Sequence, residues 1–182
     1  MLIEDGKGKN GAAAVNKNQQ IDTFSITEPE DRFLNKQGKT WSVKSETTPV
    51  GAGDYIFYLK NTGTETYAIT DVRAECGAES RLTIHKVDGT PTFAAGTDLT
   101  PVARNIGSSE PVTATIKEDT NTTGLTDHGE IFFVKCKTAG ELYHLRTTSN
   151  IIIPPGTAIA AQSSAVTSNR VTWSLTVIDP EL

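Results

Sequence analysis

The chain has 182 residues and a net charge of −5 at pH 7, a length that suits one domain with a short appended segment. No basic stripe of the kind that neutralises phosphates is present, so we expect no nucleic-acid partner. No stretch approaches the roughly 20 apolar residues of a membrane span, and the first residues lack the apolar core of a signal peptide. We therefore expect a soluble protein that is made in the cytoplasm and has no membrane partner.

The first twenty residues are rich in Gly, Asn, Lys and Ala and have no sustained hydrophobic period. Such a segment cannot bury enough apolar surface to offset the entropy of ordering itself. We predict an extended N-terminal arm over residues 1–20, which orders on a partner, and one domain over 21–182. The candidate partner-binding residues of the arm are its small apolar anchors and two lysines: Leu2, Ile3, Val15, Lys7 and Lys9.

Short strand-like segments begin after the arm. Alternation in Ile21–Thr27 predicts a first strand, and residues 28–36 predict a short helix that ends before Gly38. A second strand is predicted at Thr40–Lys44. Residues 54–61 are apolar on both faces, which predicts a central strand.

The middle of the chain alternates strands with turns, but two stretches lack a period. Residues 89–111, with several prolines and glycines, predict a long surface excursion that contains at most short strands. The turn Asp88-Gly89 precedes this excursion. Residues 118–129 are polar and predict a loop. The strands predicted around these stretches are 67–76, 80–87, 112–117, 131–137 and 142–146.

The clearest strand signal lies in the C-terminal stretch, residues 149–182. A β-branched run at 151–153 is stopped by Pro154-Pro155-Gly156, and 157–162 predicts a return strand, so we predict a hairpin. Residues 170–178 then alternate apolar and polar side chains, which is typical of a strand with one buried face. The apolar positions of this last strand are Val171, Trp173, Leu175 and Val177.

About ten short strands with turns between them predict an all-β, antiparallel sandwich or barrel. A jelly-roll-like sandwich is the first choice, because the strands are numerous and their connections uneven. An immunoglobulin-like sandwich is the second, although Trp41 precedes both Cys76 and Cys136 and so departs from the usual order. The cysteines are too far apart for a CxxC site, and we expect two buried free thiols in place of a disulfide.

No catalytic signature emerges. Asp127-His128-Glu130 is the one local candidate for a metal site, and solvated side chains are the expected outcome there, since zinc needs three or four converging ligands. His85 and His144 alternate with polar residues and are expected on the surface. We therefore predict no catalytic residue, no metal and no cofactor, and a protein that is not an enzyme.

Several short sequence segments, each covering a turn and part of a strand, are similar to those of a known group of proteins. They are Gly11-Ala-Ala-Ala-Val-Asn-Lys-Asn with Thr23-Phe-Ser-Ile-Thr-Glu, Tyr58-Leu-Lys-Asn-Thr, Asn105-Ile-Gly-Ser-Ser, Gly129-Glu-Ile-Phe-Phe and Ile153-Pro-Pro-Gly-Thr-Ala-Ile-Ala. In these phrases the sequence resembles the small jelly-roll virion proteins of tailed bacteriophages, which decorate or cement heads or sit at necks and tails. The resemblance implies a non-enzymatic structural protein of the virion, made in the host cytoplasm.

The resemblance also implies partners, namely capsid or other virion proteins and further copies of the chain, with a trimer at a three-fold position. A neighbouring subunit would shield uncovered strand edges such as Tyr55–Asn61. The alternative is a carbohydrate- or receptor-binding module of a tail or fibre, in which Tyr67 or Tyr143 could stack on a sugar. The loops at 89–111 and 118–129 are poor in aromatic residues, which favours the structural role.

Overall fold

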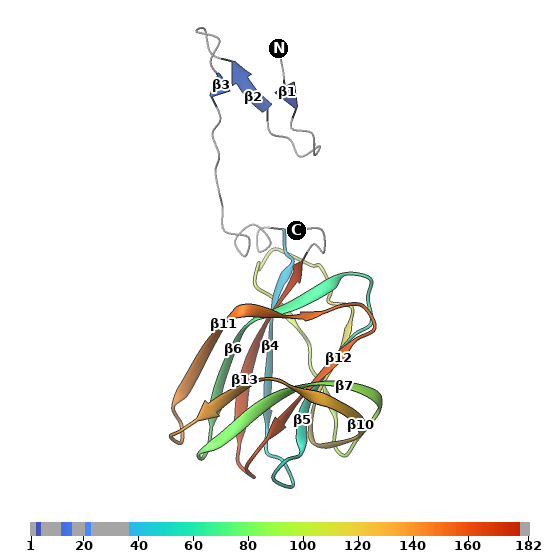
Figure 1. Ribbon diagram of the computed structural model, residues 1–182, viewed down its shortest axis with the longest axis vertical. Helices are drawn as coiled ribbons and strands as arrows, with labels where there is room; N and C mark the ends of the chain where they lie inside the picture. Colours follow the sequence, from blue (N-terminus) through green and yellow to red (C-terminus); the bar gives the residue numbers. More distant parts are fainter. Residues whose placement is uncertain (1–2, 5–11, 16–20, 23–36, 179–182) are drawn as a thin grey trace. The chain divides into compact units, whose positions relative to one another are not determined.

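The computed structural model describes residues 3–4, 12–15, 21–22 and 37–178 (Figure 1). The chain divides into two units, Met1–Glu30 (the N-terminal unit) and Asp31–Leu182 (the sandwich unit). In the N-terminal unit, three short strands pair antiparallel in the order β1-β2-β3; they are β1 (Ile3–Glu4), β2 (Ala12–Val15) and β3 (Ile21–Asp22). The remainder of the predicted first strand and the predicted helix at 28–36 lie outside the described residues.

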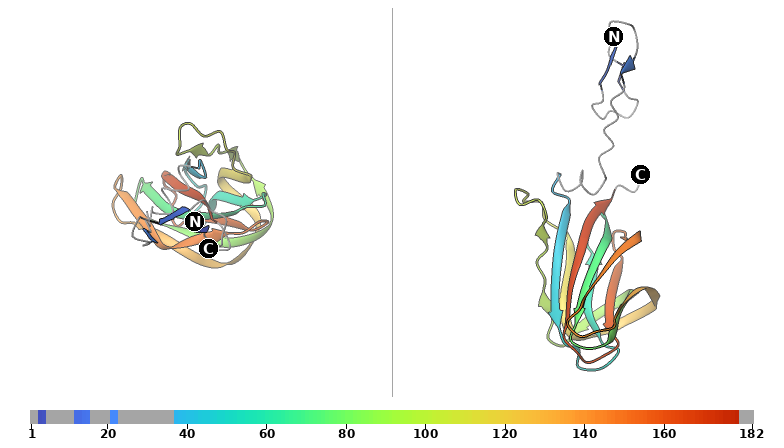
Figure 2. Two further views of the ribbon diagram at one scale, coloured as in Figure 1. Left: turned by 90° about the horizontal axis from the view of Figure 1, so that it is seen from above. Right: turned by 90° about the vertical axis from the view of Figure 1, so that its left-hand side faces the viewer.

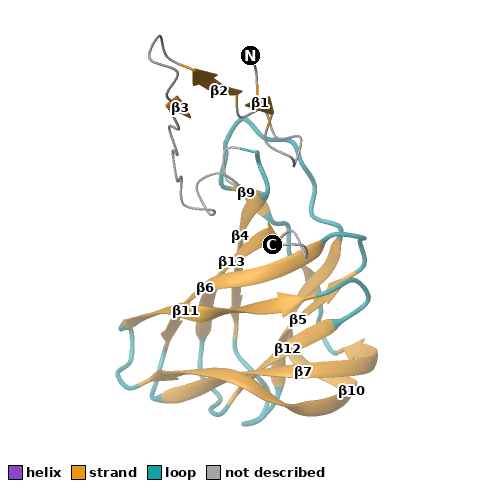
Figure 3. Cartoon of the chain, turned by 45° about the horizontal axis from the view of Figure 1, so that its top comes forward, coloured by secondary structure: helices purple, strands orange, loops and turns teal. Residues whose placement is uncertain are grey.

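The described part of the sandwich unit contains strands and loops and no helix (Figure 3). Its strands form two five-stranded sheets with antiparallel pairing, in the orders β11-β6-β13-β4-β9 and β5-β12-β7-β10-β8. The predicted all-β sandwich is confirmed. The strands are β4 (Thr40–Thr47), β5 (Tyr55–Asn61), β6 (Thr66–Cys76), β7 (Ser80–Phe93), β8 (Thr97–Asp98), β9 (Val102–Ala103), β10 (Ala114–Cys136), β11 (Leu142–Ile153), β12 (Ala158–Ser163) and β13 (Asn169–Ile178).

Most connections carry the chain from one sheet to the other (Figure 2). The predicted C-terminal hairpin is wrong for this reason: β11 pairs with β6 in one sheet, whereas β12 pairs with β5 and β7 in the other. The predicted apolar positions of β13, at Val171, Trp173, Leu175 and Val177, are all buried as expected, and Ser174 and Thr176 on its other face are buried as well. A strand shows the same period of two whichever sheet it joins, so periodicity could not assign its partners.

The main core lies between the two sheets. Phe57 of β5 stacks on Trp173 of β13, with ring centroids 4.4 Å apart and the planes inclined by 17°. Within the sheet that contains β13, Trp41 of β4 meets Tyr67 of β6 edge-on, with ring centroids 6.2 Å apart. Offset and edge-to-face pairs of this kind add to the hydrophobic contribution of the rings themselves. The alternating side chains recognised in the sequence are thus the ones that hold the sheets together.

The longest strand, β10, pairs with two different strands of its sheet, β5 and β7. Its residues 114–118 pair with β5, and its residues 122–136 pair with β7. Since β12 lies between β5 and β7, the four strands close a ring, and β5 has a partner on each edge. The prediction of a central strand is confirmed, and the prediction that Tyr55–Asn61 offers an uncovered edge is wrong.

The predicted loop at 118–129 and the beginning of the predicted excursion at 89–111 are strand, whereas the rest of that excursion contains only the two-residue strands β8 and β9, as predicted. The polar stretch 118–129 continues β10, with register shifts at several points, and residues 88–93 continue β7 past Asp88-Gly89. Gly89 and Gly124 face each other across this ribbon and have positive φ values of 96° and 73°. A Cβ on Gly124 would lie 2.5 Å from the Thr90 carbonyl oxygen, so only glycine fits there.

We name residues 88–93 of β7 and 122–127 of β10 the curled ribbon; it lies at the lower right of Figure 1. Phe93 and Leu125, from the two strands of the ribbon, pack against a second apolar cluster on the face of β5, β12 and β7 that points away from the main core. Phe93 meets Tyr58 at 5.9 Å between ring centroids. The second cluster consists of Tyr58, Val87, Ala158 and Ala160.

Candidate functional site

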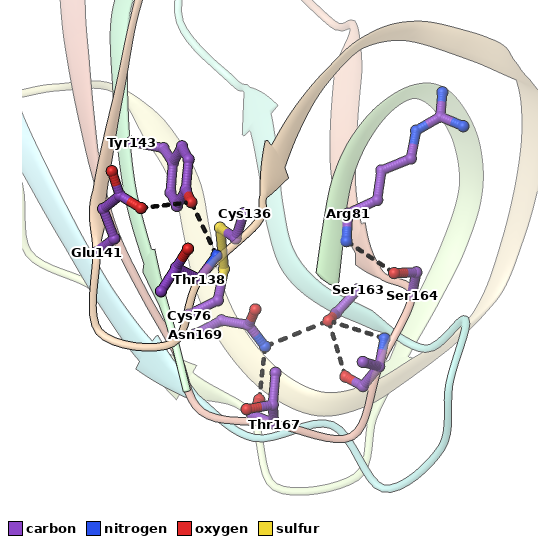
Figure 4. The surroundings of a disulfide bond; sticks show 11 residues. Cys76, Arg81, Cys136, Thr138, Glu141, Tyr143, Ser163, Ser164, Thr167 and Asn169 are labelled. Carbon is purple, nitrogen blue, oxygen red and sulfur yellow. Dashed lines mark hydrogen bonds between the residues drawn. A yellow bond between two sulfur atoms is a disulfide. The ribbon is translucent and has the colours of Figure 1, made fainter. Parts of the chain in front are cut away.

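A disulfide bond joins Cys76, the last residue of β6, to Cys136, the last residue of β10 (Figure 4). Their Cα atoms are 6.2 Å apart, within the usual range for a disulfide. The expectation of two free thiols is wrong. The bond ties the two sheets together across the main core, and proximity between residues 60 positions apart is a property of the tertiary fold that sequence spacing does not reveal.

The serines near the disulfide stabilise turns through hydrogen bonds of their hydroxyl groups. The buried Ser163 hydroxyl donates to the Ala165 carbonyl at 2.9 Å and accepts a hydrogen bond from Asn169 Nδ2 at 3.3 Å (Figure 4). The Ser164 hydroxyl accepts from the Arg81 backbone N–H at 2.7 Å. A nucleophilic serine needs a base within hydrogen-bond reach, and the partners of these hydroxyls are amides and a carbonyl.

Each of the chain's three histidines contacts an aspartate. The ring-to-carboxylate distance is 2.9 Å for His85 with Asp127, 2.6 Å for His128 with Asp88 and 2.6 Å for His144 with Asp71. The side chains of the candidate group Asp127-His128-Glu130 thus have separate partners, since Glu130 pairs with the Arg81 guanidinium at 2.5 and 2.6 Å. Within the described residues, no group of three His, Cys, Asp or Glu side chains is placed to hold a metal.

His85 is buried, with 9% of its surface exposed, so the prediction of a surface histidine is wrong for this residue. His85 does point to the face of β7 away from the main core, but the curled ribbon covers that face. The Tyr55 ring meets the His85 ring edge-on at 5.6 Å, and its hydroxyl donates to Asp127 at 3.0 Å. His144 has a half-exposed side chain, as predicted.

The pKa values of Tyr55 and Asp127 are both shifted from their usual values. Burial, together with the hydrogen bond to the Asp127 carboxylate, raises the pKa of Tyr55 to about 12. Burial pushes the pKa of Asp127 upward, but hydrogen bonds from the Gly129 N–H, Tyr55 and His85 outweigh it and leave this pKa below its usual value. The tyrosine is therefore a neutral donor and the aspartate an anion at neutral pH, an arrangement that fixes the start of β5 to the curled ribbon.

Asp119 organises the other end of the curled ribbon and was not recognised in the sequence. Its buried carboxylate accepts hydrogen bonds from the backbone N–H groups of Ala94, Ala95 and Thr120 at 2.8–2.9 Å, and from the Thr122 hydroxyl at 3.2 Å. Burial raises its pKa, but these hydrogen bonds prevail and the pKa is lowered. The carboxylate thereby satisfies amides where β7 ends and β10 bends.

The tyrosines considered for sugar stacking do not present free faces. Tyr67 is 1% exposed, and its hydroxyl accepts a hydrogen bond from the Thr113 N–H at 3.0 Å. Tyr143 packs partly buried against the main core, and its hydroxyl accepts from the Thr138 N–H at 2.8 Å and donates to Glu141 at 2.8 Å (Figure 4). Tyr67 is thus excluded as a stacking platform, and Tyr143 is committed to a turn.

Two of the five partner-binding candidates lie among the described residues. Ile3 pairs with Ala13 between β1 and β2, and Val15 pairs with Ile21 between β2 and β3. Leu2, Lys7 and Lys9 lie outside the described part of the chain. Their role in binding stays a prediction.

Among the described residues, none belongs to a helix with the length and hydropathy needed to cross a bilayer. Comparisons of the chain with protein-family models, curated proteins and solved structures returned no match.

Proposed function

We propose that this chain is a non-enzymatic structural protein of a bacteriophage virion, which decorates or cements the capsid surface through its N-terminal segment. The observation that carries the proposal is the division of the chain into a sandwich unit and a separate small β unit, Met1–Glu30. Units below about 40 residues seldom bury enough surface to fold alone and usually need a staple or a partner. A partner surface on the particle would meet that need.

The polar groups of the sandwich unit support the same role, because they form hydrogen bonds within the chain. The hydroxyls of Ser163 and Ser164 and the carboxylate of Asp119 bind backbone groups of the same chain. Such polar groups rigidify a fold because they satisfy buried donors and acceptors. A rigid body of this kind suits a protein that is exposed on a particle.

We also propose that the sandwich is a jelly roll. Apart from the two-residue strands β8 and β9, the sheets contain four strands each, in the orders β4-β13-β6-β11 and β5-β12-β7-β10. Consecutive strands lie in alternate sheets except at β7 and β10, as two interlocked Greek keys require. The fold occurs in capsid and lectin domains, so it agrees with the proposed role without deciding it.

A virion location agrees with the disulfide between Cys76 and Cys136. Disulfides are rare in a reducing cytoplasm and persist outside the cell. A chain made in the host cytoplasm would form this bond when the particles are released. The bond would then tie the two sheets in the environment where the particle must survive.

The test is binding of the purified chain to particles assembled without it, measured by co-sedimentation. We expect the full chain to bind and a variant lacking residues 1–30 to lose binding at least tenfold while it keeps its thermal unfolding temperature. The matched control is the substitution of Lys7 and Lys9 by alanine, which separates charge from the rest of the segment.

Unchanged particle binding by the deletion variant would rule out the N-terminal unit as the anchor. Failure to find the chain in purified particles by mass spectrometry would remove the virion role altogether. Retention of a glycan on an array by the sandwich unit would move the assignment to the carbohydrate- or receptor-binding alternative.

A further inference from the structure

Aspartate side chains attach the curled ribbon to the rest of the sandwich unit at both of its ends. Where the ribbon joins the sheet of β5, β12 and β7, His85 of β7 contacts Asp127 of β10 at 2.9 Å. Beside this pair, Asp88 of β7 contacts His128 of β10 at 2.6 Å. The two pairs thus cross between the same strands in opposite directions. At the far end of the ribbon, the Asp119 carboxylate accepts hydrogen bonds from three backbone amides.

The two histidines of these pairs differ in their access to water. His128 has a half-exposed side chain, whereas His85 is buried beneath the ribbon. Within the part of the chain that the structure describes, the Nε2 atom of His85 has no hydrogen-bond partner. A protonated His85 therefore carries an N–H at Nε2 that nothing accepts while the ribbon is in place.

Asp127 is the group that balances a positive charge on His85. The other titratable groups that face this ring are Tyr55 of β5 and the cross-strand partner Glu130 of β10. Tyr55 is a neutral donor, and the charge of Glu130 is already balanced by Arg81. The residue opposite His85 on β12 is an alanine. The charge on the buried ring thus depends on one carboxylate.

The three aspartates that hold the ribbon all have lowered pKa values. The hydrogen bond from His128 is the main cause that lowers the pKa of Asp88, and the charge of Lys86 acts in the same direction. Burial raises the pKa of Asp119 and of Asp127, but the hydrogen bonds to these carboxylates outweigh it. Their stabilising contribution is fully present above the unfolded value of about 3.9 and is lost as the pH falls through the folded value. Imidazoles, which titrate between about pH 5 and 8, are protonated at that point.

We propose that the curled ribbon is an acid-sensitive strap, which lifts from the second apolar cluster when its three aspartates take up protons, while the main core stays folded. Protonation of Asp127 leaves a charged His85 beneath the ribbon without the carboxylate that balances it. A buried charge without a partner is strongly destabilising. Lifting the ribbon gives the His85 ring access to water and removes this cost.

The fold allows the ribbon to move while the rest of the sandwich unit stays in place. On either side of the ribbon β10 is paired, with β5 at residues 114–118 and with β7 at residues 130–136. Gly89 and Gly124, with their positive φ values, let the two strands of the ribbon bend between these stretches. The main core is held by apolar side chains and by the disulfide, which do not titrate in acid. The strap does not depend on the virion role, and the two proposals can fail separately.

The first experiment follows the backbone amide resonances of the isotope-labelled full chain by NMR from pH 7 to pH 2. We expect the resonances of the ribbon, and those of Ala94 and Ala95, to lose their native positions below about pH 4, where carboxylates take up protons. The resonances of β4, β6 and β13 are expected to keep theirs. Loss of all native resonances in one step, or a ribbon that keeps its native resonances at pH 2, would overturn the proposal.

The second experiment identifies the group that drives the release. Asp127→Asn keeps the shape of the side chain and removes its charge, so we expect the pH midpoint of ribbon release to rise by about one unit or more. His85→Gln removes the buried cation and is expected to lower the midpoint. His144→Gln is the matched control, because His144 has its own aspartate partner, Asp71, between β11 and β6, and it is expected to leave the midpoint unchanged.

His85→Gln keeps the proposal testable if Asp127→Asn does not fold. Equal shifts of the midpoint in His85→Gln and His144→Gln would overturn the proposal, because the buried ring would then have no special part in the release. A midpoint that Asp127→Asn leaves in place or lowers would overturn it as well.

Discussion

Single polar residues decide how the curled ribbon is held. Asp119 gives its carboxylate to three backbone amides and one hydroxyl, and Asp127 accepts from Tyr55 and from the Gly129 N–H. A hydrogen bond to a charged group contributes about 1.5–3 kcal/mol, so each of these carboxylates matters through the donors that it satisfies. Neither role could be recognised in the sequence, because the donors Ala94, Ala95 and Tyr55 lie far along the chain from the carboxylates that they reach.

Asp119→Ala is expected to lower the free energy of unfolding by about 3 kcal/mol, because it leaves the amides of Ala94 and Ala95 without their acceptor. Urea denaturation at pH 7 measures the loss. Asp98→Ala is the matched control: Asp98 is largely exposed and forms a surface ion pair with Lys117, so the expected change is about 0.5 kcal/mol or less. Equal losses in the two variants would contradict the role given to Asp119.

The loss of stability caused by Asp119→Ala should depend on pH. The pKa of Asp119 is lower in the folded chain than the value of about 3.9 in an unfolded one. Over the interval between these two values the unfolded state binds more protons, so stability falls as the pH falls. The stabilising contribution is fully present above the unfolded pKa and is lost below the folded one, and the difference between wild type and Asp119→Ala should shrink from pH 7 to pH 2.5.

At the scale of elements, β10 is the strand that the sequence describes least well. Its residues 118–129 are polar because their outward side chains face solvent, and several register shifts interrupt the alternation that would reveal a strand. The same bends let one strand close both edges of its sheet. A strand that needs glycines to bend carries the sequence signal of a loop.

Gly124→Ala is expected to destabilise the chain by about 3 kcal/mol, because the φ of 73° strains any residue with a Cβ and the Thr90 carbonyl oxygen would lie 2.5 Å from that atom. Thermal and urea unfolding measure this cost. Gly107→Ala is the control, since Gly107 has no positive φ and its nearest contact would be an ordinary 3.6 Å. A Gly124 variant as stable as the Gly107 variant would show that the ribbon does not need this bend.

For the whole molecule, the bond between Cys76 and Cys136 is the covalent tie between the sheets. It closes a loop of 60 residues, for which the chain-entropy account gives about 4 kcal/mol of stabilisation. The double substitution Cys76→Ser, Cys136→Ser is expected to lose about that amount in urea denaturation. Reductant should destabilise the wild type to a similar extent and leave the double variant unchanged; a wild type indifferent to reductant would contradict this.

The sequence by itself determined the fold class, most strand positions and the inward-facing residues. Alternation identified β13, because a strand with one apolar face carries a period of two wherever it lies, and apolar residues on both faces identified β5 as a central strand. The same alternation also identified which apolar side chains of β13 are buried. The N-terminal segment was also distinguished by its composition, although its role remains a proposal.

Only the tertiary structure decided which strands are neighbours. The partners of β12 and β13, the disulfide, the burial of His85 and the closure of β5 by β10 all depend on residues far apart in the chain. Periodicity reports which face of a strand is buried, but it does not report what covers that face or what pairs with its edges.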